Sequence, residues 1–203
     1  MSPSSDFTLR SPLSLVVLAL LFERPMHPYL MQKLIVERGK DKVVNVRSRN
    51  SVQQTVTRLE RAGLIESSTP SREGGHPART VYSLTDEGAA ALLDALHDAL
   101  ARPALEHPMF AAALSFMSVT TVGAVTEMLT RRRAELDRRI DEEQISLDAG
   151  RRRLPEIFLI ENDYIITMLE AERAWIDRAL AAIRAGALTW DTDQLRTDAL
   201  TGN

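Results

Sequence analysis

Residues 46–84 read VRSRNSVQQTVTRLERAGLIESSTPSREGGHPARTVYSL, and this stretch decides the fold. In its first part the apolar residues Val52, Val56 and Leu59 recur at steps of four and three, which places them on one side of a helix. Gly63 follows the helix as a stop, because glycine readily adopts the left-handed conformation that ends helices. The apolar residues on either side of a polar, glycine-containing tip then predict a two-stranded β-hairpin.

The other side of the predicted helix carries polar side chains that can hydrogen-bond to base edges and phosphates. Such a helix by itself is more often simply solvated, but the glycines and arginines of the hairpin tip favour close approach to DNA. The residues expected to contact bases are Asn50, Ser51, Gln53, Gln54 and Thr57. Those expected to contact phosphates are His27, Tyr29, Arg47, Arg49, Arg58, Arg72, His76 and Arg79. For His76, a purely solvated position is an equal alternative.

The composition is that of a folded protein of one or two domains, with 203 residues of which 44% are hydrophobic and 26% charged. The absence of cysteine excludes disulfides, thiol chemistry and thiolate metal sites. The four histidines are scattered without metal-ligand spacing, and the sequence has neither a phosphate-binding glycine loop nor a GxSxG nucleophile motif. We therefore expect no enzyme activity, no catalytic or metal-ligating residue and no cofactor.

Charge is unevenly distributed along the chain, although its formal net value is only −3. Residues 1–80 carry 12 Lys and Arg against 7 Asp and Glu, whereas residues 81–203 carry 13 against 21. A basic front half fits binding to a polyanion, and an acidic rear half fits self-association or the sensing of a signal.

An apolar run, LSLVVLALLF at residues 13–22, precedes the deciding stretch. No cleavage site of small residues follows it, and it is far shorter than the roughly 20 residues that a membrane helix needs. We expect a buried first helix opened by Ser11 and Pro12, and hence a cytoplasmic protein without a membrane partner. A second helix from Pro28 to Gly39 completes the order helix, helix, helix, hairpin, which indicates a winged helix-turn-helix.

Three stretches of this front half together resemble the signatures of the PadR family of bacterial transcriptional regulators. They are LVVLALLFERPMHPYLMQKL at 15–34, NSVQQTVTRLERAGLIES at 50–67 and GGHPARTVYSLTDEGAAAL at 74–92. The resemblance covers residues 12–97 closely and extends more loosely to FLIENDYIITMLEAERAWIDRALAAIRAGALTW at 158–190, which is similar to the last dimerisation helix of the longer members. It implies a homodimeric repressor, often self-regulating and sometimes released by a small molecule.

Two residue positions depart from the family pattern. Pro28 stands where the family usually has glycine, and Gln53 and Gln54 stand where it often has Tyr-Pro. The second departure falls on the face expected to read bases, so the operator sequence does not carry over from relatives.

The rear half is predicted to consist of helices. Thr85 caps a helix that runs to about Ala101, residues 107–117 are a helical connection, and a long helix covers about 121–149 up to Gly150. On this long helix, near-heptad spacing relates Val125, Leu129, Leu136, Ile140 and Leu147. A last helix from Pro155 carries two apolar stripes. The first is Ile157, Ile160, Tyr164, Met168, Ala171, Trp175 and Ala179, and the second is Phe158, Ile165, Leu169, Ile176, Leu180 and Ile183.

Two stripes on one helix cover more than a single neighbouring helix buries. We expect the surplus to pack on a second copy of the chain, which would place two recognition helices about 34 Å apart on an inverted-repeat operator. A self-contained monomeric bundle is the alternative. Tyr164, Met168 and Trp175 share the first stripe and could line a pocket at the dimer seam for a small apolar or aromatic effector, although plain core packing is the more common role of such residues.

The sequence therefore predicts a mainly α-helical protein with an N-terminal winged helix-turn-helix, a small β-hairpin wing and a C-terminal dimerisation domain of long helices. The expected domains are residues 10–100 for DNA binding, 101–190 for dimerisation and effector binding, and 191–203 as a tail. The expected partners are double-stranded DNA, a second copy of the chain and a small effector. The alternative function is a winged-helix adaptor that binds proteins and not DNA.

Overall fold

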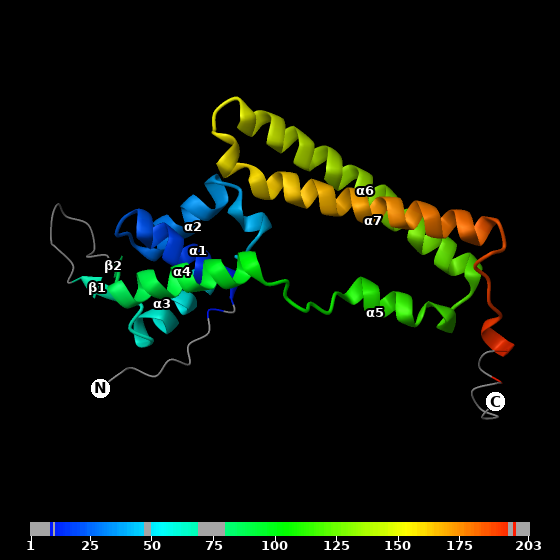
Figure 1. Ribbon diagram of the computed structural model, residues 1–203, viewed down its shortest axis with the longest axis horizontal. Helices are drawn as coiled ribbons and strands as arrows, with labels where there is room; N and C mark the ends of the chain where they lie inside the picture. Colours follow the sequence, from blue (N-terminus) through cyan, green and yellow to red (C-terminus); the bar gives the residue numbers. More distant parts are fainter. Residues whose placement is uncertain (1–8, 10, 47–49, 69–79, 195–196, 198–203) are drawn as a thin grey trace. The chain divides into compact units, whose positions relative to one another are not determined.

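The computed structural model describes residues 9, 11–46, 50–68, 80–194 and 197 of the chain. The chain forms two compact units, residues 1–105 and residues 106–203 (Figure 1). The mainly α-helical fold with one two-stranded hairpin, predicted from the sequence, is confirmed. None of the helices within the described ranges is long and apolar enough to cross a lipid bilayer.

Unit 1 follows the predicted winged-helix order. Pro12 and Pro28 open the first two helices, because proline fits the first turn, where its missing N–H needs no partner. Gly39 and Gly63 have φ angles of 65° and 73° and end the second and third helices, as predicted. The elements are α1 (Pro12–Glu23), α2 (Pro28–Glu37), the 3₁₀ turn η1 (Lys40–Lys42), α3 (Ser51–Arg61), β1 (Ile65–Ser68), β2 (Val81–Leu84) and α4 (Asp86–Ala101).

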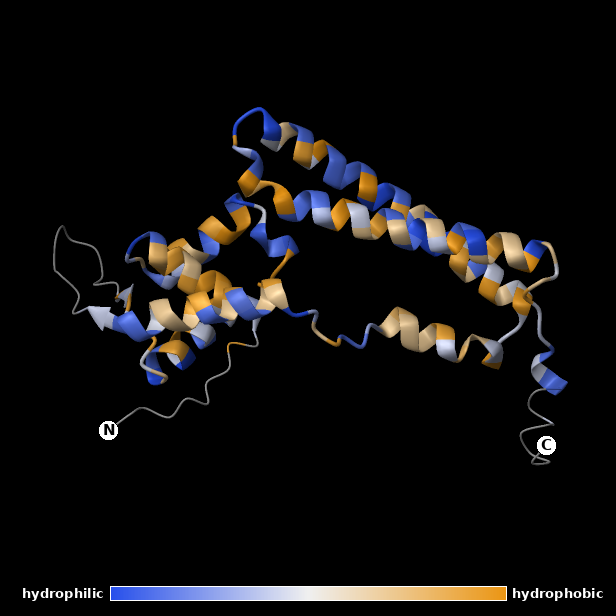
Figure 2. Cartoon of the chain, viewed as in Figure 1, coloured by the Kyte–Doolittle hydropathy of each residue, from blue (hydrophilic) through white to orange (hydrophobic). Residues whose placement is uncertain are grey.

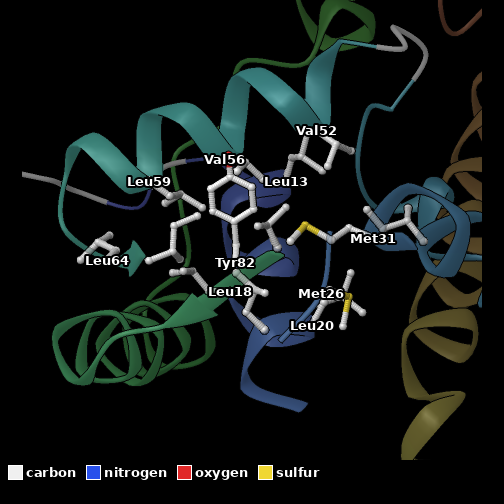
Figure 3. Packing of buried hydrophobic residues seen from close by; sticks show 14 of the residues in the cluster. Leu13, Leu18, Leu20, Met26, Met31, Val52, Val56, Leu59, Leu64 and Tyr82 are labelled. Carbon is white, nitrogen blue, oxygen red and sulfur yellow. The ribbon is translucent and has the colours of Figure 1, made fainter. Parts of the chain in front are cut away.

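The core of unit 1 lies where α1, α2 and α3 pack against the hairpin (Figure 3). α3 contributes the predicted stripe of Val52, Val56 and Leu59, and all three side chains are buried. Figure 3 shows the Tyr82 ring of β2 directly beneath this stripe. Because one side of α3 is fixed in the core, its other side must face solvent.

Both edges of β2 are paired, and one of them joins the hairpin to the segment between α1 and α2. On one edge β2 pairs antiparallel with β1, with Ile65 opposite Leu84. On the other edge Met26, between α1 and α2, exchanges two backbone hydrogen bonds of 3.0 and 3.1 Å with Tyr82. The base of the wing is therefore held in a fixed position relative to the first two helices.

The junction between the hairpin and α4 is tightly packed. Thr85 Oγ1 accepts the Gly88 N–H at 3.0 Å, as the predicted cap, and donates to the Gly63 carbonyl oxygen at 2.8 Å. A Cβ atom at Gly88 would lie only 1.9 Å from the Leu64 carbonyl oxygen. This close approach requires glycine and holds the start of α4 against the end of α3.

Unit 2 is built around an antiparallel pair of long helices, α6 and α7 (Figure 1). The near-heptad residues predicted from the sequence all lie on the buried side of α6. Ion pairs join the two helices at their edges, from Arg133 to Asp177 at 2.6 Å and from Arg132 to Glu172 at 2.6 Å. The elements are α5 (Met109–Ser115), η2 (Met117–Val119), α6 (Val122–Arg151), η3 (Glu156–Phe158) and α7 (Ile160–Arg184).

The two apolar stripes predicted for the last helix have different environments. Leu169, Ile176 and Leu180 of the second stripe are buried against α6, with Ile165 and Ile183 packed at the edge of the same core. In the first stripe, the large side chains are exposed: Ile157 by 72%, Ile160 by 62%, Tyr164 by 64%, Met168 by 51% and Trp175 by 37%. One stripe therefore forms the core of unit 2, and the other is an apolar surface.

Two predicted helix boundaries are wrong, and one residue of the second stripe lies outside the core. α6 does not end at Gly150 but continues to Arg151, because Gly150 instead makes room for Leu159, whose Cδ2 would lie 2.6 Å from a Cβ at that position. Pro155 opens only the short turn η3, since Leu159 turns into a small core with Leu147 and Ile166 before α7 begins. Phe158, in that turn, is consequently exposed rather than buried.

Candidate nucleic-acid interface

The outer face of α3 is a continuous polar surface. Gln53, Gln54, Arg58 and Arg61 are exposed and Thr57 is half-buried, and together they line a hollow of about 340 Å³. They lie opposite the buried stripe on the same helix, because 100° per residue separates the two sets by about half a turn. This face presents amide, hydroxyl and guanidinium groups, and the hollow has no carboxylate in its lining.

Gln53 is connected to the hairpin by Tyr82. Burial raises the pKa of the Tyr82 phenol, the charge of Glu60 raises it further, and a side-chain hydrogen bond with Gln53 lowers it in part. Tyr82, a residue only 7% exposed, thus reaches from β2 to the side chain of Gln53. Sequence reasoning missed this role, because the apolar pattern marks Tyr82 only as a strand residue.

Two other side chains of the face have partners within unit 1. Arg58 Nη2 donates a hydrogen bond of 2.6 Å to Oγ of Ser14, a residue of α1 that is 1% exposed. The guanidinium has five N–H donors, so this bond fixes its direction and leaves donors for an anion. Thr57 Oγ1 donates to the Gln53 carbonyl oxygen at 3.0 Å, so towards solvent its oxygen acts as an acceptor.

His27 and Tyr29 lie at the start of α2. The Nδ1 atom of His27 accepts the Leu30 N–H at 3.1 Å and thereby caps the helix, which places the proton of the neutral ring on Nε2. The rings of His27 and Tyr29 are stacked, with centroids 6.0 Å apart. Tyr29 is exposed, and both groups are donors of the kind that bind phosphate at a helix start.

The other predicted contacts divide into two groups. Asn50 is the N-cap residue of α3 and Ser51 its first residue, at the end of the polar face where the helix begins. The remaining phosphate contacts lie outside the described residues: Arg47, Arg49, Arg72, His76 and Arg79. Arg61 was not among the predicted contacts, although the helical spacing from Gln54 and Arg58 places it on the same face.

The three residues proposed for an effector have different surroundings within one copy of the chain. Tyr164 and Met168 lie on the exposed stripe of α7, whereas Trp175 lines a hollow of about 650 Å³ beside α5. There the Phe110 ring meets the Trp175 ring edge-on at 5.9 Å, and the Arg132 guanidinium lies 3.7 Å above the Phe110 ring centre. Sequence reasoning missed Phe110 and Arg132, which belong to other helices.

The sequence model of the transcriptional regulator PadR-like family matches residues 17–94. Residues 17–94 therefore form a PadR-like domain. The resemblance predicted from the sequence is thereby confirmed, and the PadR-like domain extends from α1 into α4, so it contains α3 and both strands of the hairpin. No curated protein matches the chain.

Solved structures of PadR proteins share the fold over most of this chain. The crystal structure of Bacillus subtilis PadR in complex with operator DNA has a TM-score of 0.65 at 18% identity and covers 84% of this chain and 97% of its own. The same protein with p-coumaric acid has a TM-score of 0.64 at 16% identity, covering 86% and 98%. The PadR-like regulator BC1756 from Bacillus cereus has a TM-score of 0.59 at 16% identity, covering 86% and 99%. The shared fold therefore includes the helices that follow the PadR-like domain.

Proposed function

We propose that this PadR-like regulator is a cytoplasmic repressor that binds an inverted-repeat operator as a homodimer. The observation that carries the proposal is the outer face of α3, where exposed amide and guanidinium groups surround a shallow hollow without a carboxylate. A helix of this kind, backed by a buried core and followed by a hairpin, is the part of a winged helix that enters the major groove.

The side chains of this face match the chemistry of base edges. A glutamine amide can make two hydrogen bonds to adenine, so Gln53 and Gln54 are the proposed base readers, with Asn50, Ser51 and Thr57 beside them. Tyr82 orients Gln53 from the hairpin side. The proposed phosphate contacts in the described part of the chain are His27, Tyr29 and Arg58.

The exposed stripe of α7 supports the homodimer. Ile160, Tyr164 and Met168 are each more than half exposed, and apolar residues in a continuous row on a helix are costly in water. A second copy that presents the same stripe would cover this surface by a two-fold interface. A dimer would also supply two copies of α3 for successive major grooves, about 34 Å apart.

Two of the similar structures support DNA and effector binding. Bacillus subtilis PadR was solved with operator DNA and with p-coumaric acid. We propose a small aromatic effector for this chain also, bound at the hollow where Trp175 lies beside Phe110 and Arg132. Tyr164 and Met168 are then assigned to the dimer interface, where the same stripe of the second copy would cover their exposed side chains.

Selection from a pool of random duplex DNA tests the proposal. The full-length chain should enrich an inverted repeat whose half-sites are one helical turn apart. Gln54→Ala should relax the enriched sequence at one position of each half-site, with a loss of about 1–3 kcal/mol of discrimination against the wrong base. Gln144→Ala, which removes an exposed glutamine from α6, is the matched control and should leave the enriched sequence unchanged.

Two results would contradict parts of the proposal. Equal weakening by Gln54→Ala on matched and scrambled duplexes would show that this residue does not read a base. A chain that enriches no duplex at low salt would instead support the alternative, a winged-helix adaptor that binds proteins.

A further inference from the structure

α1 is apolar almost throughout, with one hydroxyl in its buried part. From Leu13 to Phe22 every residue except Ser14 is apolar, and Figure 2 shows α1 mainly in the colours of hydrophobic residues. Ser14 is only 1% exposed and lies on the buried side of the helix with Val17 and Leu18. Alanine would suit this position better, because it has the higher helix propensity and carries no hydroxyl to be taken out of water. The stability of α1 alone therefore does not explain a serine here.

The Ser14 hydroxyl is bonded to a side chain of α3. Its Oγ accepts the 2.6 Å hydrogen bond that Arg58 donates from Nη2. Because the donor is charged, this bond is stronger than one between neutral groups, and it restricts the rotamers of the long Arg58 side chain. The guanidinium keeps its other N–H donors, and Arg58 is exposed at the hollow on the outer face of α3. The buried side of α1 thus anchors a guanidinium that remains open to solvent.

Arg61 provides a comparison on the same face. It lies three residues after Arg58, is also exposed and lines the same hollow. Among the described residues, none makes a hydrogen bond or an ion pair with the Arg61 guanidinium. Arg61 must therefore lose rotamer freedom when it binds an anion, whereas Arg58 has lost much of that freedom already in the folded chain.

The place of Arg58 along α3 suits a phosphate contact. Arg58 lies in the last turn of the helix. In helix-turn-helix proteins the first residues of the recognition helix contact the base edges, so the last turn lies nearer the DNA backbone. A planar guanidinium with a fixed direction matches two oxygens of one phosphate.

We propose that Ser14 is a positioning residue for DNA binding. It does not touch DNA, and it holds Arg58 in the direction in which the guanidinium binds a phosphate. The side chain of Arg58 is then ordered during folding rather than during binding. This inference rests on the proposed DNA-binding function and deepens it, because it gives the buried helix α1 a part in the affinity for DNA.

A double-mutant cycle tests this role, with the inverted repeat enriched by the parent chain as the duplex. Ser14→Ala should lower the affinity of the parent chain by about 2- to 10-fold, which corresponds to ordering one long side chain on binding. In an Arg58→Ala background the same substitution should have no effect, because no guanidinium remains to be held. In an Arg61→Ala background, the matched control, Ser14→Ala should again lower the affinity by about 2- to 10-fold. Thermal unfolding followed by circular dichroism should show that Ser14→Ala is as stable as the parent chain.

The salt dependence of binding separates positioning from the loss of a charge. Ser14→Ala leaves the charge of Arg58 in place, so the slope of log affinity against log salt should remain that of the parent chain. Arg58→Ala should make this slope less steep by about 0.9, because one phosphate contact is lost.

Three results decide between the possibilities. An equal loss of affinity on Ser14→Ala in the parent and Arg58→Ala backgrounds would overturn the inference, because Ser14 would then act through the packing of α1. An unchanged affinity of Ser14→Ala in the parent chain would also overturn it. A parent chain that binds no duplex at low salt would instead overturn the proposed function itself.

Discussion

α3 in unit 1 and α7 in unit 2 each bury one side in a core, but their outer sides differ. The outer side of α3 carries Gln53, Gln54 and Arg61, which water solvates well. The outer side of α7 carries Ile160, Tyr164 and Met168, whose exposure to water is unfavourable. The outer side of a helix is therefore informative by its polarity: a polar outer side suits a nucleic acid, and an apolar one suits another protein surface.

The cores of the two units also differ, in how completely each is enclosed by its own unit. In unit 1, buried residues come from α1, α2, α3, α4 and the hairpin, so the fold encloses its own core. In unit 2, the main core is a single layer between α6 and α7, closed at one side by Phe110 and Met117. We therefore expect unit 2 to gain more of its stability from a second copy than unit 1 does.

The largest effect is expected from a charge in the exposed stripe of α7. Met168→Glu would place a carboxylate in the proposed dimer interface, where burial without a partner is strongly unfavourable. The chain should then sediment as a monomer at micromolar concentration. Its affinity for the operator should fall by about 10²-fold or more. In a monomer the two DNA-binding units are no longer linked, so the avidity of binding both half-sites together is lost.

The matched control for Met168→Glu is Ala181→Glu. Ala181 is exposed on α7 but belongs to neither apolar stripe, so a carboxylate there should leave both sedimentation and operator binding unchanged. Circular dichroism of both variants verifies that α6 and α7 remain helical. A dimeric Met168→Glu protein with full operator affinity would place the interface elsewhere.

Periodicity was enough to predict most of this fold. The steps of three and four residues at Val52, Val56 and Leu59 predicted the buried side of α3, and near-heptad spacing predicted the buried side of α6. Proline and glycine predicted several helix ends. Pro28 suits a helix start because its ring fixes φ, and Gly63 suits a helix end because glycine readily adopts the left-handed conformation. These signals are local, so they can be read without knowing what packs nearby.

The features that were not predicted depend on contacts between distant residues. Gly150 was expected to end a helix, but its actual role is to make room for Leu159, which the sequence around it does not reveal. The bond from Arg58 to Ser14 joins residues 44 positions apart, and the contact of Phe110 with Trp175 joins two helices. The same limit applies to the candidate site: its face on α3 follows from periodicity, but Tyr82 behind Gln53 does not.

A smaller effect, of opposite sign in the two units, is expected from two glycine substitutions. Gly88→Ala should destabilise unit 1 by about 1–3 kcal/mol, because its Cβ would overlap the Leu64 carbonyl oxygen and push α4 away. Gly123→Ala in α6 should stabilise unit 2 by roughly 0.5–1 kcal/mol, since no described atom beyond the adjoining backbone of its own helix lies within 4 Å of the added Cβ and alanine is the better helix former. Urea unfolding of both variants, followed by circular dichroism, measures the two changes. Equal stability of Gly88→Ala and the parent chain would mean that the junction can relax.

The smallest effect is expected from a surface ion pair that joins the end of α1 to the end of α2. Arg38 donates to both carboxylate oxygens of Glu23, at 2.5 and 2.9 Å, and this hydrogen bonding lowers the pKa of the Glu23 carboxyl. Both side chains are more than 40% exposed, so solvent screening limits the contribution to at most about 1 kcal/mol. Glu23→Gln should remove it.

The pH dependence distinguishes this pair from a packing effect. Because the pKa of Glu23 is lower in the folded chain, its contribution is fully present above the unfolded value of about 4.3 and is lost as the pH falls through the folded value. The stability difference between the parent chain and Glu23→Gln should therefore be present at neutral pH and vanish in acid. Glu37→Gln, which removes the more exposed pair with Lys33 at 3.5 Å, is the control and should change stability less. A difference that persists unchanged in acid would mean that Glu23 acts through packing and not through its charge.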